Sequence, residues 1–404
     1  MRYFLYVPLM QQSTKIGGQT TGIGKRKFAA LEGWRGVSAV FVAISHFGHG
    51  VVWHLGDTAF VGHSYLFVDF FFVLSGFVIT HAYGDRLHDA MDLAAFALRR
   101  IGRLWPLHAA VLAAWFLAQL VQFAGGALAS NVGMHAAFTD GRSPLGFVAA
   151  LFLIQGFGDW QAYGWNYPSW SIWVELWTCF VFGLVCLRPR GQRLLLAALL
   201  SLAGLAALVL AGGSMRVYLG FGFFRGLYGF FLGMLVYRLY QATGERLIPK
   251  ASLLEIASVA FAVLFVIFFG DDTLALATPL IFAVVVYVFA FEGSILSRLL
   301  KTRLLERLGR WSYSVYLNHY FILLVFVTAL RALRRIFGVG LPATEPLSLG
   351  NLYLADLLCL AYVGLAIVVS AGTFRWIEEP WRRRINGWAD HLRPLRRAAL
   401  KSAI

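Results

Sequence analysis

Ionisable side chains inside long apolar segments are the first sign of chemistry in this sequence. Arg35 and His46 are eleven residues apart in one such segment. With about 100° of rotation and about 1.5 Å of rise per residue, they share one face of a helix, and His46 lies about 16 Å beyond Arg35. Histidine can exchange a proton near neutral pH without a perturbed pKa. We therefore expect His46 near the middle of a bilayer and Arg35 at its cytoplasmic edge.

Two carboxylates and another arginine lie in further apolar segments. Asp69 is expected at a depth close to that of His46, Glu175 follows Ser171 by one helical turn, and Arg225 lies in the middle of its segment. An ionisable group inside hydrocarbon is costly and is by default a functional candidate. Asp69 could orient the imidazole of His46, as a carboxylate does in hydrolytic triads, or it could only join two helices. Arg225 is a candidate counter-ion for an internal carboxylate.

A pair of arginines, Arg100 and Arg103, lies at i and i+3 near the start of another apolar segment. Guanidinium groups bind phosphates through paired hydrogen bonds. Spacing alone favours a plainer role, in which the pair anchors the helix on the cytoplasmic side or contacts anionic lipid. The three cysteines lie in apolar runs with no His or Asp at metal-ligand spacing, so we expect neither a disulfide framework nor a metal site.

The composition indicates which elements must hold these residues. Of 404 residues, 59% are hydrophobic and 14% are charged, and the mean hydropathy is +0.69. A soluble domain has roughly 45–50% apolar and 25% charged residues. The composition therefore excludes a soluble globular enzyme and a disordered scaffold, and the long apolar runs exclude a β-barrel. The predicted fold class is all-α, a polytopic membrane helix bundle.

Ten segments are long and apolar enough to span a bilayer, which takes about 20 residues. They are residues 36–55, 61–83, 104–125, 169–187, 194–212, 217–240, 252–270, 273–292, 311–330 and 352–375. The apolar stretch 145–157 is too short to span comfortably. We predict that it forms a re-entrant or interfacial helix on the outer side.

The distribution of positive charge supports this arrangement. The net charge is +15, and the basic clusters fall in both terminal segments and in every second loop if 145–157 does not cross. By the positive-inside rule both termini are then cytoplasmic. Nucleic-acid binding is not indicated, since the basic residues lie between apolar runs. The cluster Arg331, Arg334 and Arg335 falls on the outer side instead, where it could face an anionic substrate.

The predicted organisation is one membrane domain between two short tails. Residues 1–30 are expected to be a flexible cytoplasmic tail, 31–388 the membrane domain and 389–404 a basic cytoplasmic tail, with Pro380 ending the last helix. The buried charges support either a transfer reaction across the membrane or a proton-coupled exporter of a lipid-linked sugar or small metabolite. In the exporter, His46, Asp69 and Glu175 would form a proton relay. The hydropathy shows no inverted repeat, which counts against that alternative.

Six motifs in order resemble the acyltransferase-3 family of integral-membrane O-acyltransferases. They are Arg35 with His46, the stretch 68–77 (VDFFFVLSGF), the stretch 100–103 (RIGR), the stretch 170–175 (WSIWVE), the stretch 312–319 (SYSVYLNH) and the stretch 379–381 (EPW). The resemblance extends from about residue 31 to residue 384. It implies an acyl-CoA donor, usually acetyl-CoA, that enters from the cytoplasm, no bound cofactor, and an acceptor hydroxyl on the outer side, usually of a cell-surface polysaccharide. It also implies a bacterial inner membrane protein.

The resemblance also implies a role for each motif residue. Arg35, Arg100 and Arg103 would bind the donor phosphates, and His46 would act as general base or carry the acyl group itself. Asp69 or Glu175 would orient the imidazole or hold the sugar. Contacts to the acceptor or the oxyanion are expected from a larger set: Arg225, Trp170, Ser171, Tyr313, Tyr316 and His319. A small-molecule or lipid acceptor and a longer acyl donor remain as alternatives.

Overall fold

The structure, a computed structural model, describes residues 26–125, 137–139, 141–160, 164–244, 251–337 and 346–402. Within these ranges the regular structure is helical, apart from one β-bridge between Val51 and Leu347. The elements in chain order are α1 (Ala29–Phe47), η1 (His54–Asp57), α2 (Ala59–Gly62), η2 (Ser64–Leu66), α3 (Phe67–Tyr83), α4 (Ala90–Gly125), α6 (Pro144–Leu151), η3 (Tyr167–Ser169), α7 (Trp170–Cys186), α8 (Arg190–Leu210), α9 (Gly222–Thr243), α10 (Ala251–Phe269), η4 (Thr273–Ala277), α11 (Thr278–Phe289), α12 (Ile295–Leu300), α13 (Arg303–Ile336), α14 (Leu352–Thr373), η5 (Phe374–Glu378) and α15 (Glu379–Ser402). The predicted all-helical class is confirmed.

Among the described residues, seven helical segments are long and apolar enough to cross a membrane. They are Ala59–Tyr83, Ala90–Gly125, Tyr167–Cys186, Arg190–Leu210, Ala251–Phe269, Arg303–Ile336 and Leu352–Leu392. The other three predicted spans overlap shorter or displaced elements. The span 36–55 overlaps α1, which ends at Phe47, the span 217–240 overlaps α9, and the span 273–292 overlaps η4 and the 12-residue α11. The chain therefore has the character of an integral membrane protein, and the count of ten spans stays a prediction.

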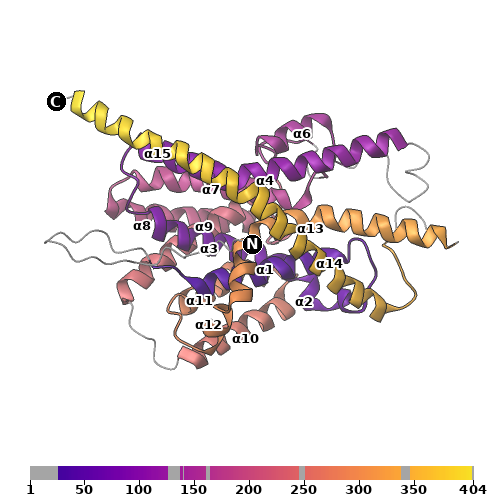
Figure 1. Ribbon diagram of the computed structural model, residues 1–404. Coiled ribbons are helices and arrows are strands. Elements are labelled where there is room, and N and C mark those ends of the chain that lie inside the picture. Colours follow the sequence, from indigo (N-terminus) through magenta and orange to yellow (C-terminus); the bar gives the residue numbers. More distant parts are fainter. Residues whose placement is uncertain are drawn as a thin grey trace, which may run out of the picture.

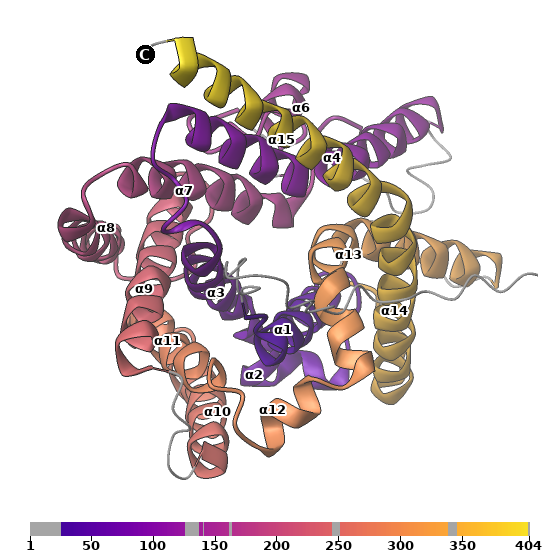
Figure 2. The same ribbon diagram turned by 60° about the vertical axis from the view of Figure 1, so that its left-hand side comes forward.

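The helices α1 and α3 lie inside the bundle, and the other long helices surround them (Figure 2). Two glycine contacts set this arrangement. A Cβ on Gly76 of α3 would lie 1.8 Å from the carbonyl oxygen of Phe230 in α9, and one on Gly309 of α13 would lie 2.2 Å from that of Glu32 in α1. Only glycine permits such close backbone contact. The small residue at 76, in the Ser75–Gly76 pair, thus brings α3 onto α9.

The boundaries differ from the predicted ones at both ends of the membrane domain. Residues 1–25 of the predicted N-terminal tail lie outside the described residues. Phe28 is only 5% exposed and α1 begins at Ala29, so the packed part starts before residue 31.

The C-terminal expectation that Pro380 ends the last helix is wrong. The chain continues from α14 through the π-helical turn η5 into α15, where Pro380 is the second residue. A π turn shifts the backbone hydrogen bonds from i→i+4 to i→i+5. Proline has no N–H to donate, and this change of pattern directly before Pro380 lets the helix continue without that hydrogen bond. The predicted boundary at 388 falls inside α15. This helix lies along α4 (Figure 1).

The stretch 145–157 forms only the eight-residue helix α6, followed by turns. Ser143 caps its N-terminus by accepting a hydrogen bond from the N–H of Gly146, and Pro144 occupies its first position. At about 1.5 Å per residue, such a helix is too short to span. Its expected place at the outer surface of a membrane stays a prediction.

Candidate active site

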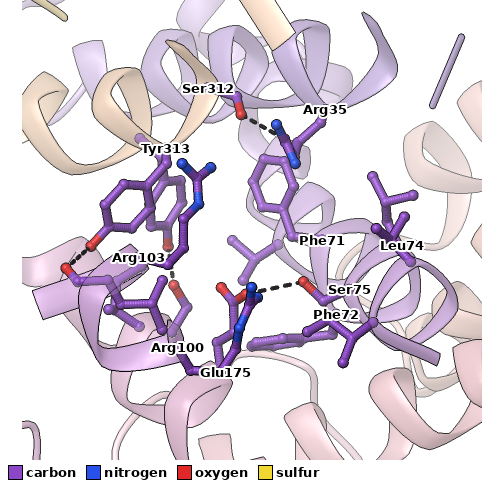
Figure 3. Close-up of a pocket in the computed structure, with 17 residues that line it drawn as sticks. Arg35, Phe71, Phe72, Leu74, Ser75, Arg100, Arg103, Glu175, Ser312 and Tyr313 are labelled. Carbon is purple, nitrogen blue, oxygen red and sulfur yellow. Dashed lines mark hydrogen bonds between the residues drawn. The ribbon is translucent and has the colours of Figure 1, made fainter. Parts of the chain in front are cut away.

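Five helices surround a cavity lined by seven of the predicted site residues, and we name it the arginine cavity. Arg35 comes from α1, Arg100 and Arg103 from α4, and Glu175 from α7, while α3 and α13 complete the wall. Figure 3 shows these side chains around one space. The remaining lining residues are Val68, Phe71, Phe72, Leu74, Ser75, Val78, Ile79, Leu104, Ser171, Ile172, Ser312, Tyr313 and Tyr316.

The three arginines differ in what they bind. Arg35 donates to the Ser312 hydroxyl and to the Gly309 carbonyl, each at 2.8 Å. Arg103 forms an ion pair with the buried carboxylate of Glu378. Among the described residues, neither Arg35 nor Arg100 has a carboxylate within ion-pair distance, and Nε of Arg100 has no hydrogen-bond partner. Arg35 and Arg100 therefore present positive charge that an anionic ligand could neutralise.

Glu175 lies on the wall of the same cavity. Its carboxylate accepts a hydrogen bond from the Ser75 hydroxyl at 3.2 Å. Glu175 does not line the cavity that contains His46. The expectation that it orients the imidazole is therefore not supported by the geometry, which places it among the arginines.

A second cavity contains His46, and we name it the histidine cavity. It is lined by Ser45, His46, His49, Gly62, Tyr65, Val68, Tyr167, Pro168, Trp170, Arg216, Tyr218 and Tyr316. Nδ1 of His46 lies 2.7 Å from the carbonyl oxygen of Val42, one turn earlier in α1. A carbonyl oxygen can only accept, so Nδ1 of the neutral imidazole carries the proton. Nε2 then keeps its lone pair, as a general base or nucleophile requires.

Aromatic and histidine rings pack around His46. Its ring centroid lies 5.0 Å from that of His319 and 5.1 Å from that of His49, and Tyr167 and Tyr320 lie within 6.0 Å. Nδ1 of His319 donates to the carbonyl oxygen of Tyr316 at 2.6 Å. Its buried Nε2 has no hydrogen-bond partner among the described residues. His319 lines neither cavity itself but packs directly against the imidazole of His46.

The two cavities share Val68 and Tyr316. The Tyr316 hydroxyl accepts a hydrogen bond from Ser171 at 2.7 Å and donates to the carbonyl oxygen of Pro168 at 3.1 Å. Along α1, Arg35 of the first cavity lies near the start of the helix and His46 of the second near its end. The cavities thus lie toward opposite ends of α1 and share Tyr316 and Val68 in their walls.

The geometry corrects the role expected for Asp69. Its carboxylate binds Arg225 of α9 through two hydrogen bonds, at 2.6 and 3.2 Å, and both side chains are fully buried. Asp69 lines neither cavity. The carbonyl oxygen of Val42 accepts the hydrogen bond from Nδ1 of His46 that a triad carboxylate would accept. Arg225 is indeed the counter-ion of an internal carboxylate, as its position in the sequence suggested.

Arg225 is not placed to contact the reacting groups. Its remaining nitrogen donates to the carbonyl oxygen of Val217 at 3.1 Å, and its guanidinium carbon lies 4.9 Å from the centre of the Trp170 ring. It lines neither cavity. Its contacts hold the segment before α9, which carries Arg216 and Tyr218, against α3 and α7.

The remaining predicted residues divide between the cavities. Tyr313 and Ser171 line the arginine cavity and Trp170 lines the histidine cavity. The Tyr313 hydroxyl donates to the carbonyl oxygen of Leu104. The described residues contain no group of three or more His, Cys, Asp or Glu that could hold a metal ion.

Two groups of residues at the cavities were not predicted from the sequence. Glu378, which pairs with Arg103, lies directly before the motif at 379–381, so that motif was the available signal. Arg216 and Tyr167 line the histidine cavity, and nothing in their local sequence marks them. Arg331 is half-buried and Arg334 donates to the carbonyl oxygen of Ser348. Both lie outside the two cavities.

Comparisons with known proteins give one family match and two relatives. A family model described as an acyltransferase domain matches residues 28–372. The chain is 41% identical over 99 residues to "Protein 2 in picA locus" of Rhizobium radiobacter, covering 22% of this chain and 47% of that protein. It is 28% identical over 332 residues to "Putative peptidoglycan O-acetyltransferase YrhL" of Bacillus subtilis (strain 168), covering 73% of this chain and 48% of that protein. The chain thus spans about half the length of these relatives, and no solved structure matches it.

Proposed function

Because this chain belongs to the acyltransferase family whose domain matches residues 28–372, we propose that it is a membrane O-acyltransferase. It moves an acetyl or other short acyl group from cytoplasmic acyl-CoA to a hydroxyl of a cell-surface or exported polysaccharide. Its location is then a bacterial inner membrane, with both termini in the cytoplasm. The relative from Bacillus subtilis, named for peptidoglycan O-acetylation, supports this class of reaction and leaves the acceptor of the present chain open.

The observation that carries the proposal is the meeting of the two cavities at Tyr316 and Val68. A reaction between substrates from opposite sides of a membrane needs one entrance for each and a shared point. The arginine cavity offers cations for an anionic donor, and the histidine cavity offers a base for a neutral hydroxyl. The membrane thickness is bridged by the donor, whose thioester sits at the end of a long flexible arm.

Donor binding follows from the guanidinium groups that, among the described residues, no carboxylate neutralises. Arg35 and Arg100 would bind the phosphates of acyl-CoA by charge-assisted hydrogen bonds. Arg103 contributes less charge, because Glu378 already neutralises it. Since Arg35 and His46 lie about 16 Å apart along α1, an acyl group on the extended arm reaches the junction beside His46.

The chemical step uses Nε2 of His46, whose lone pair the bond from Nδ1 to Val42 leaves available. Nε2 takes the proton of the acceptor hydroxyl, and the oxygen attacks the thioester carbonyl. The C–S bond then breaks, and the thiolate of CoA takes the proton from the imidazolium. In the other route Nε2 attacks the thioester first, and the C–S bond breaks to release the thiolate of CoA. The acceptor hydroxyl then attacks the acyl-imidazolium, the C–N bond breaks, and the proton of the hydroxyl passes to the thiolate. The Tyr316 hydroxyl lies at the junction and, once turned away from the carbonyl oxygen of Pro168, is the candidate donor to the oxyanion.

The alternative of a proton-coupled exporter has less support. A relay would connect His46, Asp69 and Glu175, yet in the structure Asp69 binds Arg225 and Glu175 binds Ser75. Neither carboxylate lines the histidine cavity. The family match also favours transfer chemistry.

The test is transfer of radiolabelled acetyl from acetyl-CoA, together with the mass profile of surface glycans from cells carrying each variant. His46→Ala should abolish an acetyl increment that the intact protein produces. The matched control is His54→Ala, because His54 lies in η1 outside both cavities and pairs with Asp356. Near-normal turnover by His46→Ala would show the mechanism to be wrong. Equal glycan masses with and without the gene would contradict the polysaccharide acceptor.

A further inference from the structure

The helix α15 has two faces of different character. Its inner face packs on α4, where Ile385 and Ala389 are buried, with exposed fractions of 6% and 0%. A stripe on its outer face, at i, i+3 and i+7, contains Trp381, Arg384 and Trp388. The two tryptophans are 42% and 55% exposed, and the guanidinium carbon of Arg384 lies 5.4 Å from the Trp381 ring centre. We call these three residues the Trp-Arg stripe.

The position of α15 in the chain indicates what this stripe faces. The apolar helix α14 is part of a candidate membrane span, and only the turn η5 separates it from α15. In that turn Trp376 is 73% exposed. Glu378, Glu379 and Arg382–Arg384 follow the apolar helix α14 closely, so we infer that the first turns of α15 lie at the level of the lipid headgroups. Tryptophan is enriched at that level, and arginine there attracts anionic lipid.

We propose that the outer face of α15 binds the anionic phospholipid headgroups of the surrounding membrane. The tryptophan rings insert between headgroups, and the guanidinium group of Arg384 binds a phosphate. Arg383 lies on another side of the helix, where it pairs with Glu379 at 2.7 Å. That this surface is the cytoplasmic one rests on the proposed function, because the same end of the bundle contains the arginine cavity.

The contact with lipid has a consequence for the arginine cavity. Glu378 directly precedes α15, is 1% exposed, and pairs with Arg103 on the cavity wall. Arg99 of α4 also pairs with Asp390 of α15, at 2.5 Å. Lipid that holds α15 against α4 therefore keeps Glu378 beside Arg103 and preserves the shape of the donor entrance.

The first test is amide hydrogen exchange of the full chain in nanodiscs of phosphatidylcholine alone or with added phosphatidylglycerol. Phosphatidylglycerol should slow exchange along α15 by up to about fivefold per arginine in contact, converted from roughly 1 kcal/mol per basic residue. The triple variant Trp381→Ser, Arg384→Glu, Trp388→Ser should exchange equally in both compositions. The control Arg303→Glu, an exposed position at the start of α13, should retain the wild-type difference.

Equal exchange of wild-type α15 in the two compositions would overturn the proposal, and so would a triple variant that keeps the difference. Hydrogen exchange needs no donor and no turnover, so it tests lipid binding by α15 independently of the acyltransferase proposal. The second readout is the KM for acetyl-CoA, which should rise in the triple variant and stay unchanged in Arg303→Glu. An unchanged KM in the triple variant would contradict the link between lipid contact and the donor entrance.

Discussion

The variant Asp69→Asn separates the two roles that Asp69 could have. The carboxylate and Arg225 are both fully buried and share two hydrogen bonds. Asn leaves the guanidinium charge without compensation in a low-dielectric site, which costs about 3–5 kcal/mol. For 404 residues, at about 2.1 cal/mol/K of unfolding entropy per residue, this lowers Tm by about 4–6 °C. We expect the protein that remains folded to keep most of its kcat, because Asp69 does not contact His46.

The assay is thermal unfolding in nanodiscs, combined with turnover per folded molecule below the transition. The comparison variant is Asp69→Leu with Arg225→Met, which replaces the buried ion pair by apolar side chains of similar size. Such replacements are often neutral or stabilising. The double variant should therefore recover most of the Tm that Asp69→Asn loses, although it also loses the bond from Arg225 to Val217.

The reasoning would be refuted by an Asp69→Asn protein with wild-type Tm and no turnover. That result would mean that Asp69 acts on the reacting groups, as the sequence suggested, and that the pair with Arg225 gives way during the reaction. A double variant that is less stable than Asp69→Asn would also contradict it, because the penalty would then not come from an uncompensated charge.

Two further substitutions test the packing and the donor site. Gly76→Ala should lose about 1–3 kcal/mol of stability, because its Cβ would lie 1.8 Å from the Phe230 oxygen. In the control Gly364→Ala in α14, the Cβ meets nothing within 4 Å, so Tm should be equal or higher. A wild-type Tm in Gly76→Ala would argue against the close contact of α3 and α9. Arg100→Ala should raise the KM for acetyl-CoA by about 10- to 150-fold, from a charged hydrogen bond of about 1.5–3 kcal/mol. Arg303→Ala, which removes an exposed guanidinium at the start of α13 outside the cavity, should change that KM less than twofold, and equal effects of the two substitutions would count against donor binding by Arg100.

Much of this protein could be predicted from short-range patterns. Apolar runs identified the membrane class, because burying a span takes a fixed length of apolar chain. The spacing of Arg35 and His46 placed them on one side of α1, and the structure brings each to its own cavity, with Tyr316 between. Gly76 is a small residue of the kind that a close helix contact requires, and it makes such a contact with α9. In each case backbone hydrogen bonds within one helix, or the size of one residue, fix the outcome.

Which carboxylate meets which cation was decided by the tertiary structure. Asp69 and Arg225 are 156 residues apart, and Arg103 and Glu378 are 275 apart. The sequence gives the height of a residue along its helix but not the direction in which the helix turns it relative to other helices. Asp69 was therefore predicted near His46, whereas the packing of α3 on α9 places it against Arg225. Helix neighbours depend on packing across the whole chain, so the partner of a buried charge follows from the fold and not from its local sequence.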